Sequence, residues 1–280
     1  MQHCFSTDED DNPTPQAFFK FTLKAEVDPK KQAFAISVQQ QGDRLKNYRL
    51  TDPNKKFEPS SFNISLMTEN GEFVNGRFGG QNFNFSLMNE HDVLKPGKYV
   101  IMVDPLWNKS AQLNRQYKEV MLDIYAPEAV LIDQLDDATG FKYFAEALKR
   151  HAQKNANEET REHYLKDNED YGMDVVRVQD IEPLPVWYGY IYTKNDSKLA
   201  LQETLRPELE GMSVIYPIKS DEDEKESQAV EEEEAKEKEI TITIKVPAGE
   251  DNIVILRRAR FENVRYSLKY LTHAPELTDE

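Results

Sequence analysis

The sequence contains few residues whose types and spacing could support catalysis. Cys4 is the single cysteine, and a nucleophilic cysteine needs an electropositive pocket that favours its thiolate. Cys4 instead lies between His3 and the acidic run of residues 8–11. His151 and His163 are twelve residues apart in polar surroundings with no third ligand, which favours solvated side chains over a metal pair. The sequence therefore predicts no catalytic residue and no enzyme activity for this chain.

Motifs for cofactors and metals are equally sparse. Residues 8–12 have the oxygen-rich spacing of a calcium loop, but they lack the glycine at the sixth position and the distal glutamate of an EF-hand. Residues 75–80 form a glycine-rich run with no expected helix after it, so the helix N-terminus that binds phosphate is missing and a hairpin turn is predicted. We expect no cofactor, while weak calcium binding stays open.

Four arginines form the one basic cluster of the sequence. They are Arg257, Arg258, Arg260 and Arg265. The formal net charge of −16 argues against nucleic acid and anionic membranes as general partners. The acidic run 221–239 precedes the cluster, and we expect it to fold back over the arginines, because a short tether keeps its local concentration high. The alternative is a solvated linker that contacts nothing. The four arginines are therefore the candidate interaction residues.

Composition and length set the class of protein. The 280 residues are 39% hydrophobic and 31% charged, and the chain is long enough for two ordinary hydrophobic cores. No window approaches the roughly 20 apolar residues of a membrane-spanning helix. The N-terminal segment is acidic, whereas targeting peptides are basic. We expect a cytoplasmic protein with no integral membrane segment.

Short alternating strands dominate residues 16–126. Apolar residues recur at every second position over 19–23, 34–38, 62–66 and 83–87, which predicts one face in a core and one face in water. Residues 99–103 are apolar on both faces, and 117–125 form a returning strand. Turn sequences such as Asp28-Pro29 and Asn70-Gly71 separate these runs. An antiparallel β-sandwich is the predicted fold of this domain.

The remaining segments complete a mainly β chain of two tandem antiparallel sandwiches. Residues 1–15 are predicted to be a disordered acidic leader. Residues 127–170 are predicted to be a helical connector, with an apolar stripe over 141–152 and a second helix over 157–165. Strand patterns return in 171–280, which predicts a second β-sandwich. The block of carboxylates at 220–239 cannot bury apolar area and is predicted to interrupt that sandwich as a disordered loop.

Three segments resemble one known family. Ala35–Arg44, Phe62–Met67 and the Pro-Gly-x-Tyr step within Leu94–Ile101 resemble the C2-like β-sandwich that follows the protease core in calpains, over residues 16–126. The resemblance implies a C2-like sandwich over residues 16–126 that regulates, positions or recruits rather than cleaves, and the repeated order of alternating strand, Pro-Gly or Pro-Ala-Gly turn and apolar strand in 240–256 predicts a second one. The papain-like core of that family is missing here: neither Cys4 nor the histidines stand in its sequence context.

The sequence therefore predicts a non-catalytic regulatory or interaction module of a calpain-like cysteine peptidase, or a protease-dead paralogue. The alternative is a structural scaffold subunit of a larger assembly, for example a cytoskeletal one, which would expose apolar patches. A hydrolase with an unrecognised site is a third hypothesis, and it would require a cleft lined by titratable groups. We expect protein partners, with calcium-dependent or lipid contacts left open.

Overall fold

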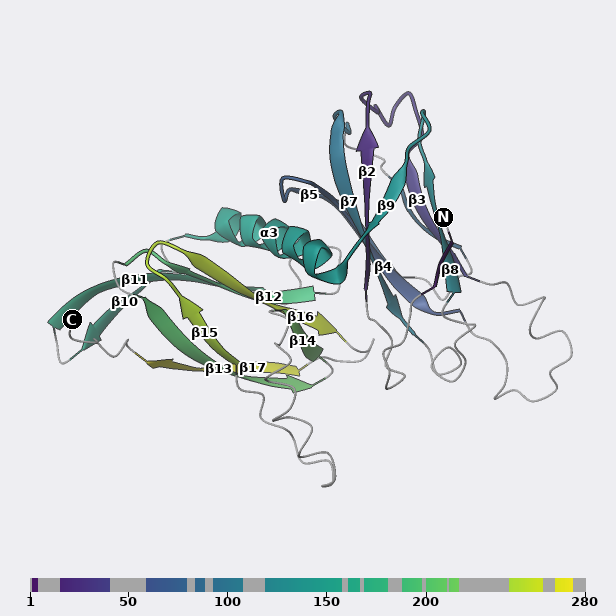
Figure 1. The fold of residues 1–280 in the computed structure, drawn as a ribbon. Helices are drawn as coiled ribbons and strands as arrows, with labels where there is room; N and C mark the ends of the chain where they lie inside the picture. The colour runs from purple at the N-terminus through teal and green to yellow at the C-terminus, as the bar shows by residue number, and fades with distance from the viewer. Residues whose placement is uncertain are drawn as a thin grey trace, which may run out of the picture. The chain divides into compact units, whose positions relative to one another are not determined.

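The structure is a computed structural model, and it describes thirteen segments of the chain. These are residues 2–4, 16–40, 59–79, 84–88, 93–107, 119–157, 161–166, 169–180, 188–197, 200–210, 212–216, 242–258 and 265–273. The chain divides into two compact units, residues 1–147 with 184–187 and residues 148–183 with 188–280. Every strand pair is antiparallel and one helix is present in the described residues. The predicted mainly β, antiparallel class is therefore confirmed (Figure 1).

The first unit contains two sheets. Sheet I has the order β5-β4-β7-β2-β9 and sheet II the order β1-β8-β3-β6. The strands of sheet I are β2 (Ala17–Leu23), β4 (Ser61–Thr68), β5 (Phe73–Gly79), β7 (Gly97–Leu106) and β9 (Ile132–Leu135). Those of sheet II are β1 (Gln2–Cys4), β3 (Ala35–Gln40), β6 (Asn84–Met88) and β8 (Glu119–Tyr125).

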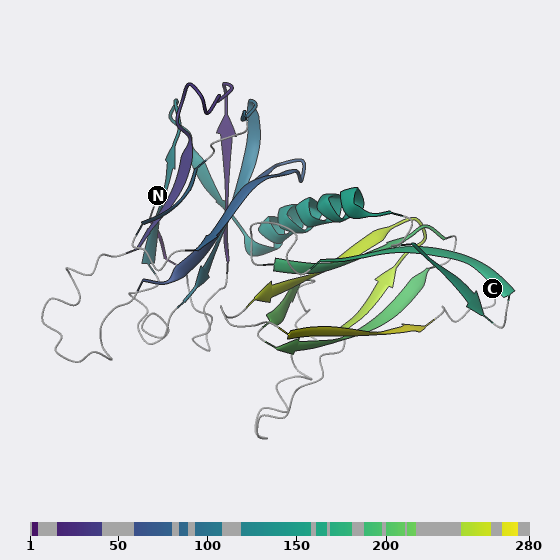
Figure 2. The same cartoon turned by 180° about the vertical axis from the view of Figure 1, so that it is seen from behind.

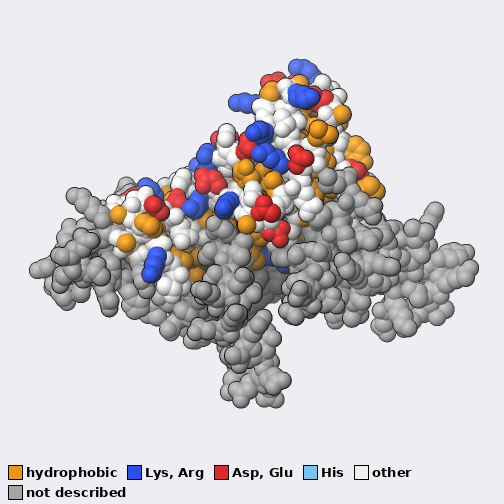
Figure 3. All heavy atoms as spheres, viewed as in Figure 1, with side chains coloured by type: hydrophobic (Ala, Val, Ile, Leu, Met, Phe, Trp, Pro, Cys, Tyr) orange, Lys and Arg blue, Asp and Glu red, His pale blue; other side chains and the backbone are white. Residues whose placement is uncertain are grey.

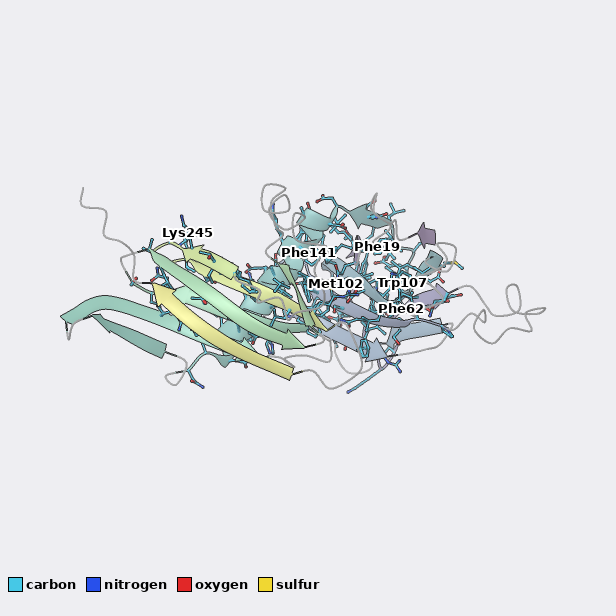
Figure 4. All side chains as sticks on the ribbon, turned by 90° about the horizontal axis from the view of Figure 1, so that it is seen from below. Phe19, Phe62, Met102, Trp107, Phe141 and Lys245 are labelled. Atoms are coloured by element: carbon cyan, nitrogen blue, oxygen red, sulfur yellow. The ribbon has the colours of Figure 1, made fainter. Side chains whose placement is uncertain are left out.

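The core of the first unit lies between these sheets. Phe19 and Phe21 of β2 belong to the same buried cluster as Ile36 and Val38 of β3, so the alternation read from the sequence does orient one face of each strand inward. The rings of Phe62 and Trp107 pack edge to face with 6.0 Å between their centroids, and both residues are labelled in Figure 4. Burial of aromatic and branched side chains from both sheets holds this sandwich together.

The outer face of sheet I is also buried, which the sequence did not predict. Asn63 and Ser65 of β4 alternate with core residues and were expected to face water, yet their exposed fractions are 1% and 0%. Part of this face is covered by α3 (Asp137–Asn155), since the rings of Phe18 and Phe141 pack edge to face at 5.1 Å. The period-two pattern identifies the inner face correctly but cannot show what covers the other one.

Helix α3 begins at an N-cap supplied by Asp136. Its carboxylate accepts hydrogen bonds from the backbone N–H of Thr139 at 2.8 Å and from the Thr139 hydroxyl at 2.7 Å. These bonds satisfy a donor that the first helical turn leaves without a partner, and they lower the pKa of Asp136. The division between the two units falls within this helix, after Ala147.

The second unit also contains two sheets. Sheet III has the order β10-β11-β12-β16-β14 and sheet IV the order β15-β13-β17. The strands of sheet III are β10 (Arg161–Lys166), β11 (Glu169–Asp180), β12 (Tyr188–Asn195), β14 (Met212–Tyr216) and β16 (Asp251–Arg258). Those of sheet IV are β13 (Leu201–Glu210), β15 (Ile242–Val246) and β17 (Arg265–His273). Figure 2 shows the two sheets of this unit as separate layers.

A buried asparagine joins the layers of the second unit. The amide of Asn195, at the end of β12, donates to the backbone oxygens of Val246 and Pro247 at 3.0 and 3.3 Å. Its side-chain oxygen accepts from the N–H and hydroxyl of Ser197. Lys245, between inward-facing neighbours on β15, points away from the sandwich and is exposed (Figure 4).

Four sequence-based expectations differ from the structure. Within the predicted helical connector 127–170, residues 132–135 form β9 and pair with β2 in sheet I. Within the predicted leader, residues 2–4 form β1 and pair with β8, His3 lying opposite Val120. Within the predicted connector, the helix expected over 157–165 is wrong: residues 161–166 form β10, because backbone pairing with β11 outweighs a weak helical pattern. The glycine-rich run expected to turn lies largely within β5. The acidic loop 220–239 lies outside the described residues.

Among the described residues, no helix is long and apolar enough to cross a membrane.

Candidate functional site

A shallow depression of about 700 Å³ opens on the first unit. Its wall is formed by the end of β8, the segment 126–130 and the start of β9, and its other side by Gln32 and Ala33 before β3. Tyr125 and Ile132 belong to the lining. Most of the lining is therefore apolar, with Glu128 as the one charged residue among those that line it.

The segment that forms the wall leaves sheet II at Tyr125 and enters sheet I at Ile132. Pro127 lacks a backbone N–H and cannot extend the β8 ladder. The Oε1 atom of Glu128 accepts hydrogen bonds from the backbone N–H groups of Lys24 and Ala25 at 2.6 and 3.2 Å. These bonds attach the segment to the end of β2, which fixes the wall of the depression in place.

Large apolar side chains are exposed along this segment. Leu131 is 88% exposed and Tyr125 is 53% exposed, whereas Val130 and Ile132 are partly buried against the core. Figure 3 shows hydrophobic side chains gathered on the side of the first unit where β8 passes into β9. Exposed apolar side chains beside a depression are typical of a binding surface. We call Tyr125, Leu131 and the depression the β9 surface.

The second unit contains a cluster of titratable groups beside the C-terminal part of α3. Asp251 of β16 accepts a hydrogen bond from Lys149 Nζ on Oδ1 at 2.5 Å, and from Tyr192 Oη and Gln153 Nε2 on Oδ2, each at 3.1 Å. Gln153 Nε2 also donates to Tyr192 Oη at 3.2 Å. Both carboxylate oxygens are therefore engaged by groups of α3 and β12.

Burial keeps Tyr192 of this cluster in its neutral form. Desolvation raises the pKa of Tyr192 far above its usual value, and the nearby Asp251 carboxylate adds to the shift. A phenol held in its neutral form donates a hydrogen bond and does not act as a base near neutral pH. The cluster attaches α3 to sheet III, and its geometry is that of a structural clamp.

A second charged cluster lies on sheet I. Glu69 forms ion pairs with Lys20 and with Lys98, the latter at 3.4 Å. The hydrogen bond between Lys20 and Glu69 raises the pKa of the lysine and lowers that of the glutamate. The ammonium of Lys20 also lies 5.9 Å from the ring centre of Tyr143 on α3. This cluster joins β2, β7 and α3 within the first unit.

The four candidate arginines do not share one sheet. Arg257 and Arg258 end β16 in sheet III, opposite Ser213 and Met212 of β14. Arg265 begins β17 in sheet IV, opposite Glu210. Arg257 is half-buried, and Arg260 lies outside the described residues. The expected contact between the arginines and the acidic run stays a prediction.

The other residues considered for chemistry are dispersed. Cys4 lies on β1 opposite Glu119, and His151 contacts the ring of Tyr190 edge to face at 6.1 Å. His163 lies on β10. Among the described residues no three His, Cys, Asp or Glu side chains are grouped to hold a metal ion, and residues 8–12 lie outside them. The sequence reasoning missed the β9 surface, for which the apolar run 129–132 after Pro127 was the available signal.

Comparison with known proteins does not identify a family for this chain. No protein-family model and no curated protein matches the chain. Among solved structures, a GH2 beta-galacturonidase from Eisenbergiella tayi is similar at 10% identity and a TM-score of 0.22, over 90% of this chain and 31% of that one. A calcium binding mutant of Bacteroides uniformis beta-glucuronidase 2 is similar at 12% identity and a TM-score of 0.22, over 95% and 27%. The chain thus spans less than a third of either protein, and similarity at this level supports no conclusion about fold or activity.

Proposed function

We propose that this chain is a non-catalytic interaction module, of the kind expected from the β-sandwich portion of a calpain-like cysteine peptidase or of a protease-dead paralogue. The observation that carries the proposal is the β9 surface. A leucine that is 88% exposed beside an apolar depression leaves apolar area in water that a partner would bury.

The chemistry of the lining supports binding over catalysis. Glu128 is the charged residue of the depression, and its Oε1 already accepts two backbone hydrogen bonds. A general acid or base needs an oxygen directed at a substrate, whereas this oxygen is directed at the chain itself. The depression offers a ligand its shape and a lining in which apolar side chains stand beside polar atoms.

The other charged clusters fit the same proposal. Asp251 binds Lys149 of α3. Glu69 binds Lys20, whose ammonium lies over the ring of Tyr143 on α3. Neither cluster belongs to the lining of the depression. We therefore assign them to stability rather than to reaction chemistry.

A structural scaffold subunit is the second candidate. Exposed apolar side chains favour it as well, because permanent assemblies bury such surface between subunits. The two candidates differ in lifetime: a regulatory module exchanges its partner, while a scaffold subunit is purified with it.

Site-specific crosslinking tests the proposal. A photoreactive amino acid replaces Leu131 in one variant and Met121 in the other, since Met121 is another exposed apolar residue of the first unit, at 43%. We expect the variant at position 131, but not the variant at position 121, to form a covalent adduct with one protein, and the purified pair to form a complex of defined stoichiometry. Equal labelling from both positions would contradict the proposal, as would peptide release from casein by the purified chain.

A further inference from the structure

Among the strands that the structure describes, none pairs with the outer edge of β9 in sheet I. β9 pairs with β2 alone, Ile132 lying opposite Phe21 and Leu135 opposite Phe18, and it ends the sheet order. No backbone–backbone hydrogen bond joins residues 126–131 to the rest of the described chain. One side of this stretch therefore presents N–H and C=O groups that a strand of another polypeptide would satisfy.

The opposite edge of the same sheet differs. There β5 runs beside β6 of sheet II, and Arg77 Nη1 of β5 donates to the backbone oxygen of Ser86 at 2.7 Å. A long side chain thus bridges the two sheets at that edge. Among the described residues no side chain bridges β9 to sheet II in this way, so the two edges of sheet I are not equivalent.

Apolar area and charge accompany the open backbone. The depression and the exposed side chains of Tyr125 and Leu131 lie where β9 begins. Asp133 of β9 is exposed and forms no ion pair with a described residue. Its neighbour across the strand pair is Lys20, whose ammonium is held by Glu69. A peptide segment bound here would therefore contact the depression and, next to it, the carboxylate of Asp133, which is available to form an ion pair.

We propose that the β9 surface binds an extended peptide segment of a partner protein, which pairs with β9 as an additional strand. The segment places an apolar side chain in the depression and a lysine or arginine near Asp133. This inference rests on the proposed function and adds the chemistry of the partner to it. An extended strand fits better than a helix, because a helix satisfies its own backbone and leaves the open edge of β9 unpaired.

The dimensions of the site agree with this occupant. β9 has four residues, which limits how many ladder hydrogen bonds an added strand can form. The depression of about 700 Å³ falls in the size range of ligand pockets and supplies the side-chain contacts that give specificity.

Selection from a random peptide library tests the proposal. Peptides of about ten residues, long enough to span one strand and its flanks, are displayed on phage and selected on the full chain. We expect enrichment of sequences with an apolar residue near a lysine or arginine. Leu131→Glu should weaken binding of the selected peptide at least about tenfold, and Asp133→Lys should weaken binding by a smaller factor. Met121→Glu is the matched control and should leave the affinity unchanged.

Hydrogen–deuterium exchange supplies the readout of strand pairing. When the selected peptide binds, amides of residues 126–135 should exchange more slowly, because added strand bonds protect them. Leu131 is almost fully exposed, so its replacement preserves the fold, which circular dichroism verifies.

Each outcome separates this inference from the proposed function. Binding that Leu131→Glu abolishes without slower exchange at 126–135 overturns strand pairing and leaves the interaction module in place. A protein adduct at position 131 without any selected peptide would have the same meaning: strand pairing is overturned and the interaction module remains. A dimer of the chain that Leu131→Glu dissociates would also overturn the peptide proposal and leave the interaction module in place. Absence of both peptide and adduct overturns the inference and the proposed function together.

Discussion

Gly140 of α3 lies directly against the ring of Phe18 on β2. A Cβ atom added to Gly140 would stand 2.1 Å from Cγ of Phe18 and 2.2 Å from Cδ2. No side chain fits at such distances, so the glycine is what lets the first turn of α3 approach sheet I. The ring of Phe18 is fully buried, and the atoms nearest to the added Cβ include Cβ and Cγ of Phe18, which lie close to the backbone and not at the end of a flexible side chain.

Gly140→Ala should therefore destabilise the first unit. Alanine favours a helix over glycine by about 1 kcal/mol, but overpacking of a core commonly costs about 1–3 kcal/mol, and the contact with Phe18 is severe. We expect a net loss of stability in urea denaturation. Gly97→Ala is the control, because no atom lies within 4 Å of a Cβ there; equal effects of the two substitutions would contradict the packing explanation.

Ser65→Ala should stabilise the chain. The Ser65 hydroxyl is fully buried and has no hydrogen-bond partner among the described residues. Such a group adds about 1–3 kcal/mol of desolvation cost, which alanine removes while leaving a cavity of one atom. We expect the denaturation midpoint to rise, corresponding to about 1 kcal/mol. An unchanged or lower midpoint would show that the hydroxyl is satisfied in solution, for example by a water molecule.

Asp136→Ala should lower the melting temperature at neutral pH. Thr139 donates two hydrogen bonds to the Asp136 carboxylate, and they lower its pKa in the folded state. The stabilisation is therefore present above the unfolded pKa of about 4 and is lost as the pH falls through the lower, folded pKa. Melting curves of both proteins between neutral and acidic pH should converge at the acidic end. A difference in melting temperature that stays constant across this pH range would mean that the charge of Asp136 contributes nothing to stability.

Tyr192 should make stability fall at alkaline pH. Its pKa is raised in the folded state, chiefly by desolvation, so its contribution is complete below the unfolded pKa of about 10. Above that pH the unfolded chain loses the phenol proton while the folded chain keeps it, and stability decreases. Compared with the parent protein, Tyr192→Phe should lose less stability between pH about 9 and about 11. Parallel curves for the two proteins would contradict a buried, neutral phenol.

Sequence periodicity identified the strands well where one face meets a core. Phe19, Phe21, Ile36 and Val38 were expected to point inward, and all four do. Its failures have a common physical origin. Arg161–Lys166 form a strand because β11 offers backbone partners, and Ser65 is buried because its sheet is covered on its second face. Pairing and covering partners lie far away in the sequence, and a local pattern carries no signal for them.

The candidate site was harder to predict for the same reason. Leu131 and Glu128 follow Pro127 in what looks like an ordinary connection. The depression exists because Glu128 binds the end of β2 and because Gln32 and Ala33 lie opposite. The four arginines were candidate interaction residues because they lie close together in the sequence. Such clustering does not determine which sheet each residue joins.

The bond between Glu128 and the end of β2 also bears on how the chain is made. Lys24 and Glu128 are 104 residues apart, and β2 acquires its two strand partners only from β7 and β9. During synthesis on a ribosome, the aromatic residues of β2 leave the exit tunnel long before either partner does. Such non-local pairing slows folding and leaves apolar segments exposed to aggregation in the meantime. The first unit should therefore fold late in translation, and its yield should respond strongly to chaperones that shield nascent chains.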